Sequence, residues 1–162
     1  MTTPHPDIKD KELHRISLTT IIYSTEGKYL ITQRALTRKA FPGKWTVPGG
    51  GLNVDDYIHS KPTNAAGQWY GALTTTIKRE IREEVGLEIG KAEYLLDITF
   101  IRPDGVPVLI LSYYAPYVSG DVKHDDETIG SAWVTAKEAE KYDLIDGILE
   151  EIQMVDKILK TK

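Results

Sequence analysis

Residues 79–87, Arg-Glu-Ile-Arg-Glu-Glu-Val-Gly-Leu, constrain the fold and the chemistry of this chain more than any other stretch. Glu80, Glu83 and Glu84 are spaced by three and four residues, so a helix would place all three carboxylates on one side. Like charges at this spacing repel one another, and divalent cations such as Mg²⁺, which take oxygen ligands, would remove that penalty. The stretch indicates either a metal site or a solvated acidic face, neutralised by pairs such as Arg79–Glu83.

The helix that carries these acids is expected to begin near Gly71 or Ala72. Gly86 follows its last residue and suits the left-handed position that ends many helices. Apolar residues recur every four positions and would bury one stripe of the helix, with the acids on the flank beside it. These apolar residues are Leu73, Ile77, Ile81 and Val85.

Apolar and β-branched runs predict six extended segments, and the turn sequence 103–105 predicts that two of them form a hairpin. Thr135 is expected to cap a short helix over 136–141, and Asp146 to cap a final amphipathic helix. This order predicts α/β layers: a mixed β-sheet with a central helix and a C-terminal helix. The six segments are 14–24, 29–34, 45–47, 91–101, 106–117 and 131–134.

Length and composition narrow the class of protein. A chain of 162 residues suits one domain, and the absence of cysteine excludes disulfides, thiolate catalysis and cysteine–zinc sites. A net charge of −4 argues against a nucleic-acid-binding protein. Residues 1–10 lack the apolar core of a signal peptide, and no run approaches membrane-spanning length. We expect a cytoplasmic protein that acts on a small molecule, with no nucleic acid and no membrane as partner.

Residues 79–87, together with Trp-Thr-Val-Pro-Gly-Gly at 45–50, resemble the signature of the Nudix hydrolases, G-x5-E-x7-R-E-U-x-E-E-x-G-U, where U is aliphatic. The strand ending at Arg34 and the pair Glu127 and Trp133 extend the resemblance over roughly residues 16–160. The resemblance implies a Nudix-type α/β/α sandwich and a single Nudix hydrolase domain over 1–162, with 1–13 as an N-terminal extension.

Two departures from this signature affect the site. Asp56 stands where the family carries its first glutamate, which belongs to the loop that supports the catalytic helix. Between Asp56 and Arg79 lie 22 residues instead of seven, so the signature is split by an insertion of about 15 residues, 57–71. We expect Asp56 to weaken that support without abolishing the metal site.

The resemblance implies hydrolysis of a nucleoside diphosphate linked to another group, with Mg²⁺ as cofactor and Mn²⁺ as a possible substitute. The implied metal ligands are Glu80, Glu83, Glu84 and the backbone carbonyl of Gly50, and Arg79 is expected to orient one of the glutamates. Three acids remain candidates for the general base, namely Glu127, Glu83 and Glu80. For Glu127 the alternative is a polar surface loop over 124–127.

Substrate contacts are expected from two segments. Arg34, Arg38 and Lys44 come from a basic stretch that could meet the phosphates or could be a basic surface loop. Tyr57 and Trp69 belong to the insertion and could stack on a base or pack the insertion onto the domain.

The leading function is hydrolysis of a (deoxy)nucleoside triphosphate or a damaged nucleotide. The alternatives are an ADP-ribose or nucleotide-sugar pyrophosphatase, to which Pro103 adds little weight, and a catalytically silent nucleotide-binding module of the same fold. An isoprenoid diphosphate isomerase, suggested by residues 33–34 and 42–45, needs a cysteine that this chain lacks. A homodimer is possible, since dimers are common in such families.

Overall fold

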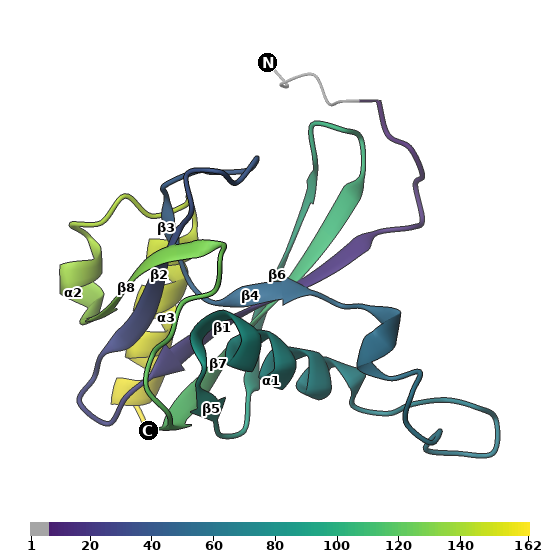
Figure 1. Ribbon diagram of the computed structural model, residues 1–162. Helices are drawn as coiled ribbons and strands as arrows, with labels where there is room; N and C mark the ends of the chain where they lie inside the picture. Colours follow the sequence, from purple (N-terminus) through teal and green to yellow (C-terminus); the bar gives the residue numbers. More distant parts are fainter. Residues whose placement is uncertain (1–6) are drawn as a thin grey trace.

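The computed structural model describes residues 7–162, which form a mixed sheet with helices on both faces (Figure 1). Within these residues eight strands join in one sheet, so the predicted α/β layers are confirmed. The strands are β1 (Arg15–Tyr23), β2 (Tyr29–Arg34), β3 (Trp45–Thr46), β4 (Gly49–Gly51), β5 (Glu88–Ile89), β6 (Glu93–Ile101), β7 (Pro107–Ser119) and β8 (Thr128–Val134). The helices are η1 (Val54–Asp56), α1 (Ala72–Val85), α2 (Ala136–Ala139) and α3 (Ile148–Lys160).

Strand β1 organises the sheet because three different strands pair along it. It runs parallel to β7 from Arg15 to Tyr23, which makes the sheet mixed. It also pairs antiparallel with β2 and with the short strand β4. The pairing with β4 places Gly50 opposite Leu18, so the glycine-rich stretch is a short strand of the sheet beside the first half of β1.

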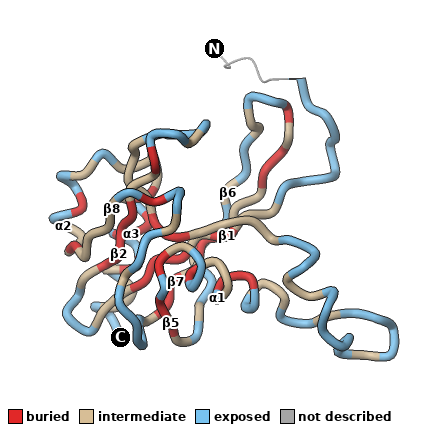
Figure 2. Tube along the Cα trace, viewed as in Figure 1, coloured by how far each residue is buried: buried red, intermediate tan, exposed pale blue. Residues whose placement is uncertain are grey.

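Two hydrophobic clusters fill the space between the sheet and its helices (Figure 2). The predicted stripe of α1 packs on one face, against apolar residues of β1 such as Leu18 and Ile22. The final helix α3 packs on the opposite face, against residues such as Ile21 and Ile31. The helix stripes that enter these clusters are Ile77, Ile81 and Val85 of α1 and Ile148, Ile152 and Val155 of α3.

Most predicted elements are present, with shifted ends. Helix α1 spans Ala72–Val85 and ends at Gly86, whose φ of 72° is the expected left-handed conformation. The predicted hairpin is β6–β7, and the segment predicted at 131–134 starts earlier, at Thr128. Helix α2 ends at Ala139, earlier than the predicted 141. The prediction that Asp146 caps α3 was wrong, because the capping position is occupied by Gly147, which has no side chain to cap with.

The insertion 57–71 forms an arm without regular secondary structure, which extends away from the rest of the molecule beyond the start of α1 (Figure 1). Its own hydrogen bonds hold it: the Asn64 amide donates to Gln68 and to Tyr70, and Trp69 Nε1 donates to the Ser60 carbonyl at 2.9 Å. Across residues 7–162, no helix combines the length and the apolar character needed to cross a membrane.

Candidate active site

Arg79, on the solvent flank of α1, lies at the centre of the predicted site. Its guanidinium donates to both carboxylate oxygens of Asp56 and, from Nη2, to the Gly51 carbonyl at 3.3 Å. The same group pairs with Glu80 and with Glu83, each at 2.9 Å. Arg79 therefore ties the loop after β4 to the acidic flank of the helix, which is more than a surface ion pair would do.

Asp56 is the principal partner of Arg79, and its side chain is only 1% exposed. The 3-10 helix η1 carries it to this position, with Asn53 as the capping residue and the Asn53 amide donating back to Asp56. Thr76 Oγ1 donates to it at 2.9 Å from the first turns of α1. The hydrogen bond from Arg79 lowers the pKa of Asp56 below its ordinary value. We expected an aspartate here to weaken the support, yet the structure shows a carboxylate bonded on all sides.

Gly50 lies directly against the carboxylate of Glu80. A Cβ at this glycine would stand 2.1 Å from both Cδ and Oε2 of Glu80, so any larger residue would push the Glu80 carboxylate out of its place. Glu80 is half-buried, and this burial raises the pKa of its carboxyl group. The predicted neighbours Gly50 and Glu80 are thus brought into contact by the pairing of β4 with β1.

Glu84 and Glu83 differ in environment although they are adjacent. Glu84 is largely buried and accepts a hydrogen bond from the Gly49 amide at 3.0 Å, and burial raises its pKa to about 7. The Glu83 side chain is 60% exposed and pairs with Arg79 at 2.9 Å. Burial would destabilise the ionised form of Glu84 unless a positive charge lay beside it.

These carboxylates fit a divalent cation by their chemistry. They offer only oxygen atoms to a metal, which are the ligands that Mg²⁺ prefers. Glu80 and Glu84 are partly or largely removed from water. The backbone of Gly50 lies so close to Glu80 that a side chain at this position would displace the carboxylate. In the described part of the chain, however, no three acids or histidines converge closely enough to enclose an ion, since Arg79 occupies the space between Glu80 and Glu83. A bound ion therefore requires small rotations of these side chains.

The end of β2 and the basic stretch after it supply two of the predicted substrate residues, Arg34 and Arg38, to the same side of the site. Arg38 forms an ion pair with Glu127, and the Ala35 amide donates to the Glu127 carbonyl at 2.9 Å. Arg34 donates to the Ala40 carbonyl at 2.9 Å. Burial and the neighbouring charge of Arg38 lower the pKa of Arg34, and the acids Glu84 and Glu127 only partly oppose this effect. The structure thus brings Arg34, Arg38 and Glu127 together beside Glu84.

The other three predicted substrate residues lie elsewhere. Lys44 pairs with Asp143, at 2.7 Å, in the segment between α2 and α3. Tyr57 and Trp69 face each other within the arm, with ring centroids 5.3 Å apart. None of these three contacts the acids of α1 through a hydrogen bond or ion pair in the described residues.

Arg15, at the start of β1, is a residue that sequence reasoning missed. A Cβ at Gly51 would stand 1.7 Å from Arg15 Nη2, and Arg15 Nη1 donates to the Leu52 carbonyl at 3.3 Å. The exposed guanidinium therefore lies over the loop whose carbonyl holds Arg79. Nothing near Arg15 in the sequence signals this position, because it follows from the pairing of β1 with β4.

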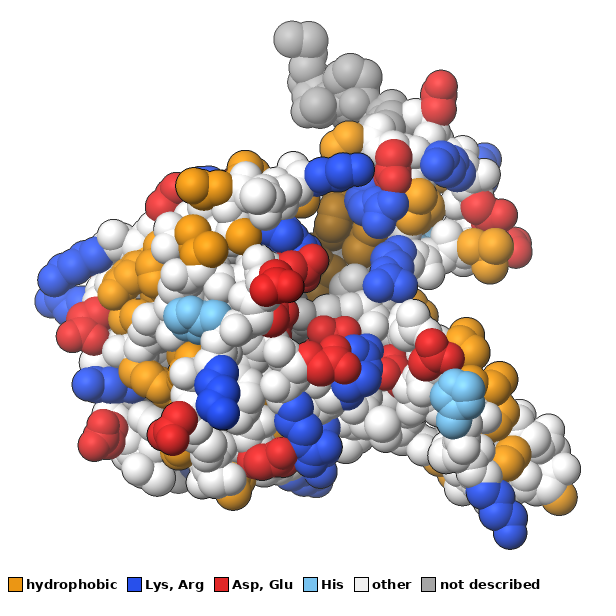
Figure 3. All heavy atoms as spheres, in the orientation of Figure 1, with side chains coloured by type: hydrophobic (Ala, Val, Ile, Leu, Met, Phe, Trp, Pro, Cys, Tyr) orange, Lys and Arg blue, Asp and Glu red, His pale blue; other side chains and the backbone are white. Residues whose placement is uncertain are grey.

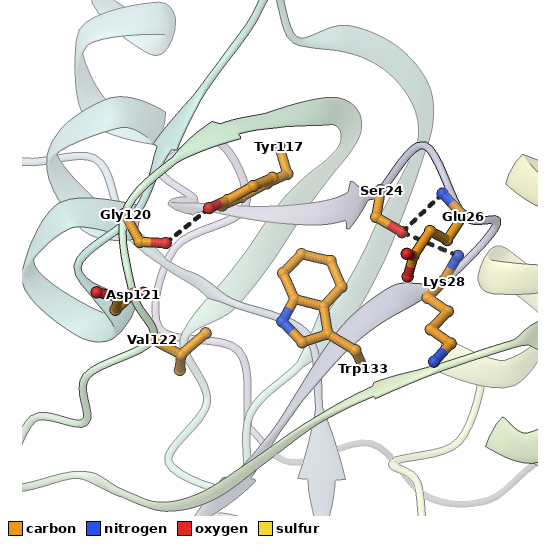
Figure 4. Close-up of a pocket in the computed structure, with 8 residues that line it drawn as sticks. All are labelled: Ser24, Glu26, Lys28, Tyr117, Gly120, Asp121, Val122 and Trp133. Carbon is orange, nitrogen blue, oxygen red and sulfur yellow. Dashed lines mark hydrogen bonds between the residues drawn. The ribbon is translucent and has the colours of Figure 1, made fainter.

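Among the hollows in the surface of residues 7–162, two bear on where the site lies. The first, in Figure 3, has hydrophobic side chains at its floor and lies between the projecting end of the β6–β7 hairpin and the body of the molecule, with charged side chains around it. The second measures about 390 Å³ and contains no predicted site residue (Figure 4). It is lined by Ser24, Glu26, Lys28, Tyr117, Gly120, Asp121, Val122 and Trp133.

Comparisons with known proteins agree with this geometry. A model of the NUDIX domain matches residues 13–152. The nucleoside triphosphatase NudI of Klebsiella pneumoniae is 29% identical over 133 residues, which cover 76% of this chain and 84% of that protein.

Two solved structures share the fold. A MutT protein from Methanosarcina mazei has a TM-score of 0.67 at 23% identity, with 98% of this chain and 99% of that chain covered. The NUDIX domain of Shewanella oneidensis NrtR, complexed with ADP ribose, has a TM-score of 0.69 at 16% identity, with 91% and 90% covered. The family match, which spans most of the sequence, shows that this chain belongs to the Nudix hydrolases.

Proposed function

We propose that this Nudix hydrolase cleaves a pyrophosphate bond of a (deoxy)nucleoside triphosphate or a damaged nucleotide, with Mg²⁺ as cofactor and Mn²⁺ as a substitute. The observation that carries the proposal is the linkage of Arg79 to Asp56 and Gly51 on one side and to Glu80 and Glu83 on the other. The similarity to NudI, a nucleoside triphosphatase, supports the choice of substrate.

In this proposal Glu80, Glu83, Glu84 and the Gly50 carbonyl hold the cation. The family uses divalent cations, which neutralise phosphate charge and lower the pKa of a bound water. Asp56 keeps Arg79 in place, and Arg79 orients the exposed Glu83 carboxylate toward the reacting water. Glu83 accepts the proton of that water, with Glu127 as the second candidate.

The basic residues beside Glu84 position the substrate. We propose that Arg34 and Arg38 bind the terminal phosphates of the nucleotide. They lie among the charges of Glu84 and Glu127, and a guanidinium can donate two parallel hydrogen bonds to a phosphate. Positioning and charge neutralisation are the main contributions that a protein makes to phosphoryl transfer. Lys44, Tyr57 and Trp69 stay predicted substrate contacts that would require movement of their segments.

Further parts of the proposal concern the whole protein. We propose one domain over 1–162, with residues 1–13 as an extension, of which 1–6 lie outside the described residues, and 57–71 as an insertion. A cytoplasmic location and a possible homodimer, with a nucleotide rather than a nucleic acid or a membrane as partner, stay predictions.

A substrate screen with Mg²⁺ and with Mn²⁺ tests the reaction, read by release of pyrophosphate against orthophosphate. We expect turnover of one or more triphosphates, and Glu83→Gln should lower kcat by roughly 10²- to 10⁴-fold without changing the melting temperature. Glu140→Gln, an exposed acid next to α2, serves as the matched control. Preference for ADP-ribose over every triphosphate would overturn the substrate. Nucleotide binding without any turnover would indicate a silent module.

A further inference from the structure

Arg15 is a charged residue beside the proposed reaction centre that the proposed mechanism does not use. Among residues 7–162, Arg15 and Arg34 have no acid within ion-pair distance, and the guanidinium of each is held only by a backbone carbonyl. The other four arginines of the chain each pair with an acid, and they are Arg38, Arg79, Arg82 and Arg102. The charges of Arg15 and Arg34 are therefore left for an anion that is not part of the protein.

The glycine at position 51 makes room for the Arg15 side chain. A Cβ at Gly51 would stand 1.7 Å from Nη2 and 2.3 Å from Cζ of Arg15, so the guanidinium fills the space of the missing side chain. Its one hydrogen bond among the described residues runs from Nη1 to the Leu52 carbonyl at 3.3 Å, although a guanidinium has five N–H groups. Arg15 is exposed, so its other donors are open to a ligand such as a phosphate.

Arg15 and the proposed reaction centre meet at the same strand. Among the described strands β4 pairs with β1 alone, so its other edge is free. At this free edge the Gly49 amide donates to Glu84, and the Gly51 carbonyl accepts from Arg79. Because Nη2 of Arg15 also lies against Gly51, the guanidinium groups of Arg15 and Arg79 are less than about 9 Å apart. A single residue of β4 thus connects Arg15 to the site.

The two arginines without an acidic partner lie at opposite ends of β4. Arg34 is close enough to Glu84 to interact with its charge, and Glu84 is bonded to the Gly49 amide. Arg15 lies over Gly51, two residues further along the strand. Two residues of a strand span about 7 Å, a distance that a chain of linked phosphates can bridge. One phosphate chain laid along the free edge of β4 can therefore contact both guanidinium groups.

We propose that Arg15 binds the phosphate nearest the nucleoside, while Arg34 and Arg38 hold the terminal phosphates. This inference rests on the proposed function, because it assumes that the substrate is a nucleotide with a phosphate chain. With its terminal phosphates at the Glu84 end of β4, the chain runs toward Gly51 and brings its nucleoside end to Arg15. The charge of Arg15 therefore acts on the nucleoside end of the substrate and leaves the terminal phosphates to the other two arginines.

Calorimetric titration in Mg²⁺ with two kinds of probe tests this assignment. The four deoxynucleoside monophosphates carry only the phosphate nearest the nucleoside, whereas methylenediphosphonate is a stable analogue of the two terminal phosphates. Hydrogen bonds between charged groups are strong, so we expect Arg15→Gln to weaken monophosphate binding about 10- to 100-fold. The affinity for methylenediphosphonate should change less than about twofold, and Arg38→Gln should show the reverse pattern.

Two further variants control for loss of charge and for structure. Arg82→Gln removes an exposed guanidinium that pairs with Glu88, and it should leave both affinities unchanged. Arg15→Lys keeps the charge without the planar fork and should restore part of the monophosphate affinity. A merely structural role of Arg15, through its bond to Leu52, would lower the melting temperature and weaken both kinds of probe together. Equal losses for the two probes in Arg15→Gln would overturn the inference.

Turnover separates this inference from the proposed function. If triphosphates are hydrolysed, Arg15→Gln should raise KM about tenfold or more with a smaller change in kcat. If none is hydrolysed but monophosphate binding still depends on Arg15, the proposed reaction fails and the role of Arg15 stands. If triphosphates are hydrolysed and Arg15→Gln keeps KM and the monophosphate affinities, the proposed function stands and the role of Arg15 is refuted. An unmodified protein that binds none of the four monophosphates would refute this role as well.

Discussion

At the scale of single residues, Asp56 shows how the signature holds Arg79 in place although an insertion divides it. Asp56 is one methylene shorter than the glutamate of the family pattern, and the 3-10 turn capped by Asn53 brings its carboxylate to Arg79. Thr76 and the Asn53 amide complete its hydrogen bonds. The insertion follows directly after Asp56, and α1 then returns the chain to the site, where Arg79 meets Asp56.

Replacing Asp56 by Asn should therefore lower both stability and turnover. Charge-assisted hydrogen bonds in a buried setting contribute about 2–3 kcal/mol, so we expect a loss of that size in the free energy of unfolding at pH 7. Turnover should fall because Arg79 no longer orients Glu83. Urea unfolding followed by tryptophan fluorescence measures the first effect, and the nucleotide assay the second.

The stability effect of Asp56 should depend on pH. Its pKa in the folded protein lies below the ordinary value of 3.8, chiefly because of the hydrogen bond from Arg79. The stabilisation is thus complete above 3.8 and is lost as the pH falls through the folded value. The difference between the unmodified protein and Asp56→Asn should shrink below about pH 4. Asp55→Asn, an exposed neighbour, should show no such trend; a constant difference at every pH would refute the assignment.

At the scale of elements, the arm over 57–71 behaves as a unit attached to the site at one end. Tyr57 and Trp69 contact each other, and Asn64 holds Gln68 and Tyr70. The sequence left open whether these rings stack on a base or pack the insertion onto the domain. In the structure they pack against each other within the arm.

Trp69→Ala tests the two interpretations of the arm. We expect kcat and KM to stay within about twofold, because the ring lies against Tyr57, while the arm becomes easier to cleave by proteases. Tyr70→Ala, which removes a side chain that is 69% exposed, provides a comparison within the same segment. A tenfold rise of KM in Trp69→Ala alone would show that the indole binds substrate.

At the scale of the whole molecule, the proposed reaction centre is built from segments of both halves of the sequence. Helix α1, the β4 loop and the segment before β8 each contribute charged groups, and the sheet aligns them. Glu84 is the least stable of these as an ion, since burial raises its pKa to about 7. A cation at this place would favour its ionised form and so bind the folded state more tightly than the unfolded chain.

Addition of Mg²⁺ should therefore raise the melting temperature of the unmodified protein. At a concentration of about 100 times Kd the gain is about 2.7 kcal/mol, or roughly 5–10 °C for a chain of this size. Scanning calorimetry in EDTA and in Mg²⁺ measures the shift. Glu84→Gln should lose most of it, whereas Glu138→Gln, an acid far from the site in α2, should retain it. An equal shift in Glu84→Gln would place the cation elsewhere.

The sequence by itself determined the elements whose signals are local. The four-residue repeat from Leu73 to Val85 predicted α1, Gly86 predicted its end, and the spacing of Glu80, Glu83 and Glu84 predicted a shared acidic flank. The turn before β7 likewise predicted the hairpin with β6. Such features need contacts only within a few residues, so periodicity and turn chemistry suffice to find them.

The tertiary structure alone decided which distant residues meet. The parallel pairing of β1 with β7 and the pairing of β4 with β1 place Gly50 on Glu80 and Arg15 over Gly51. Lys44, predicted beside the phosphates, is instead held by Asp143. Strand register and helix placement arise from contacts between segments far apart in the chain, and no local pattern encodes them.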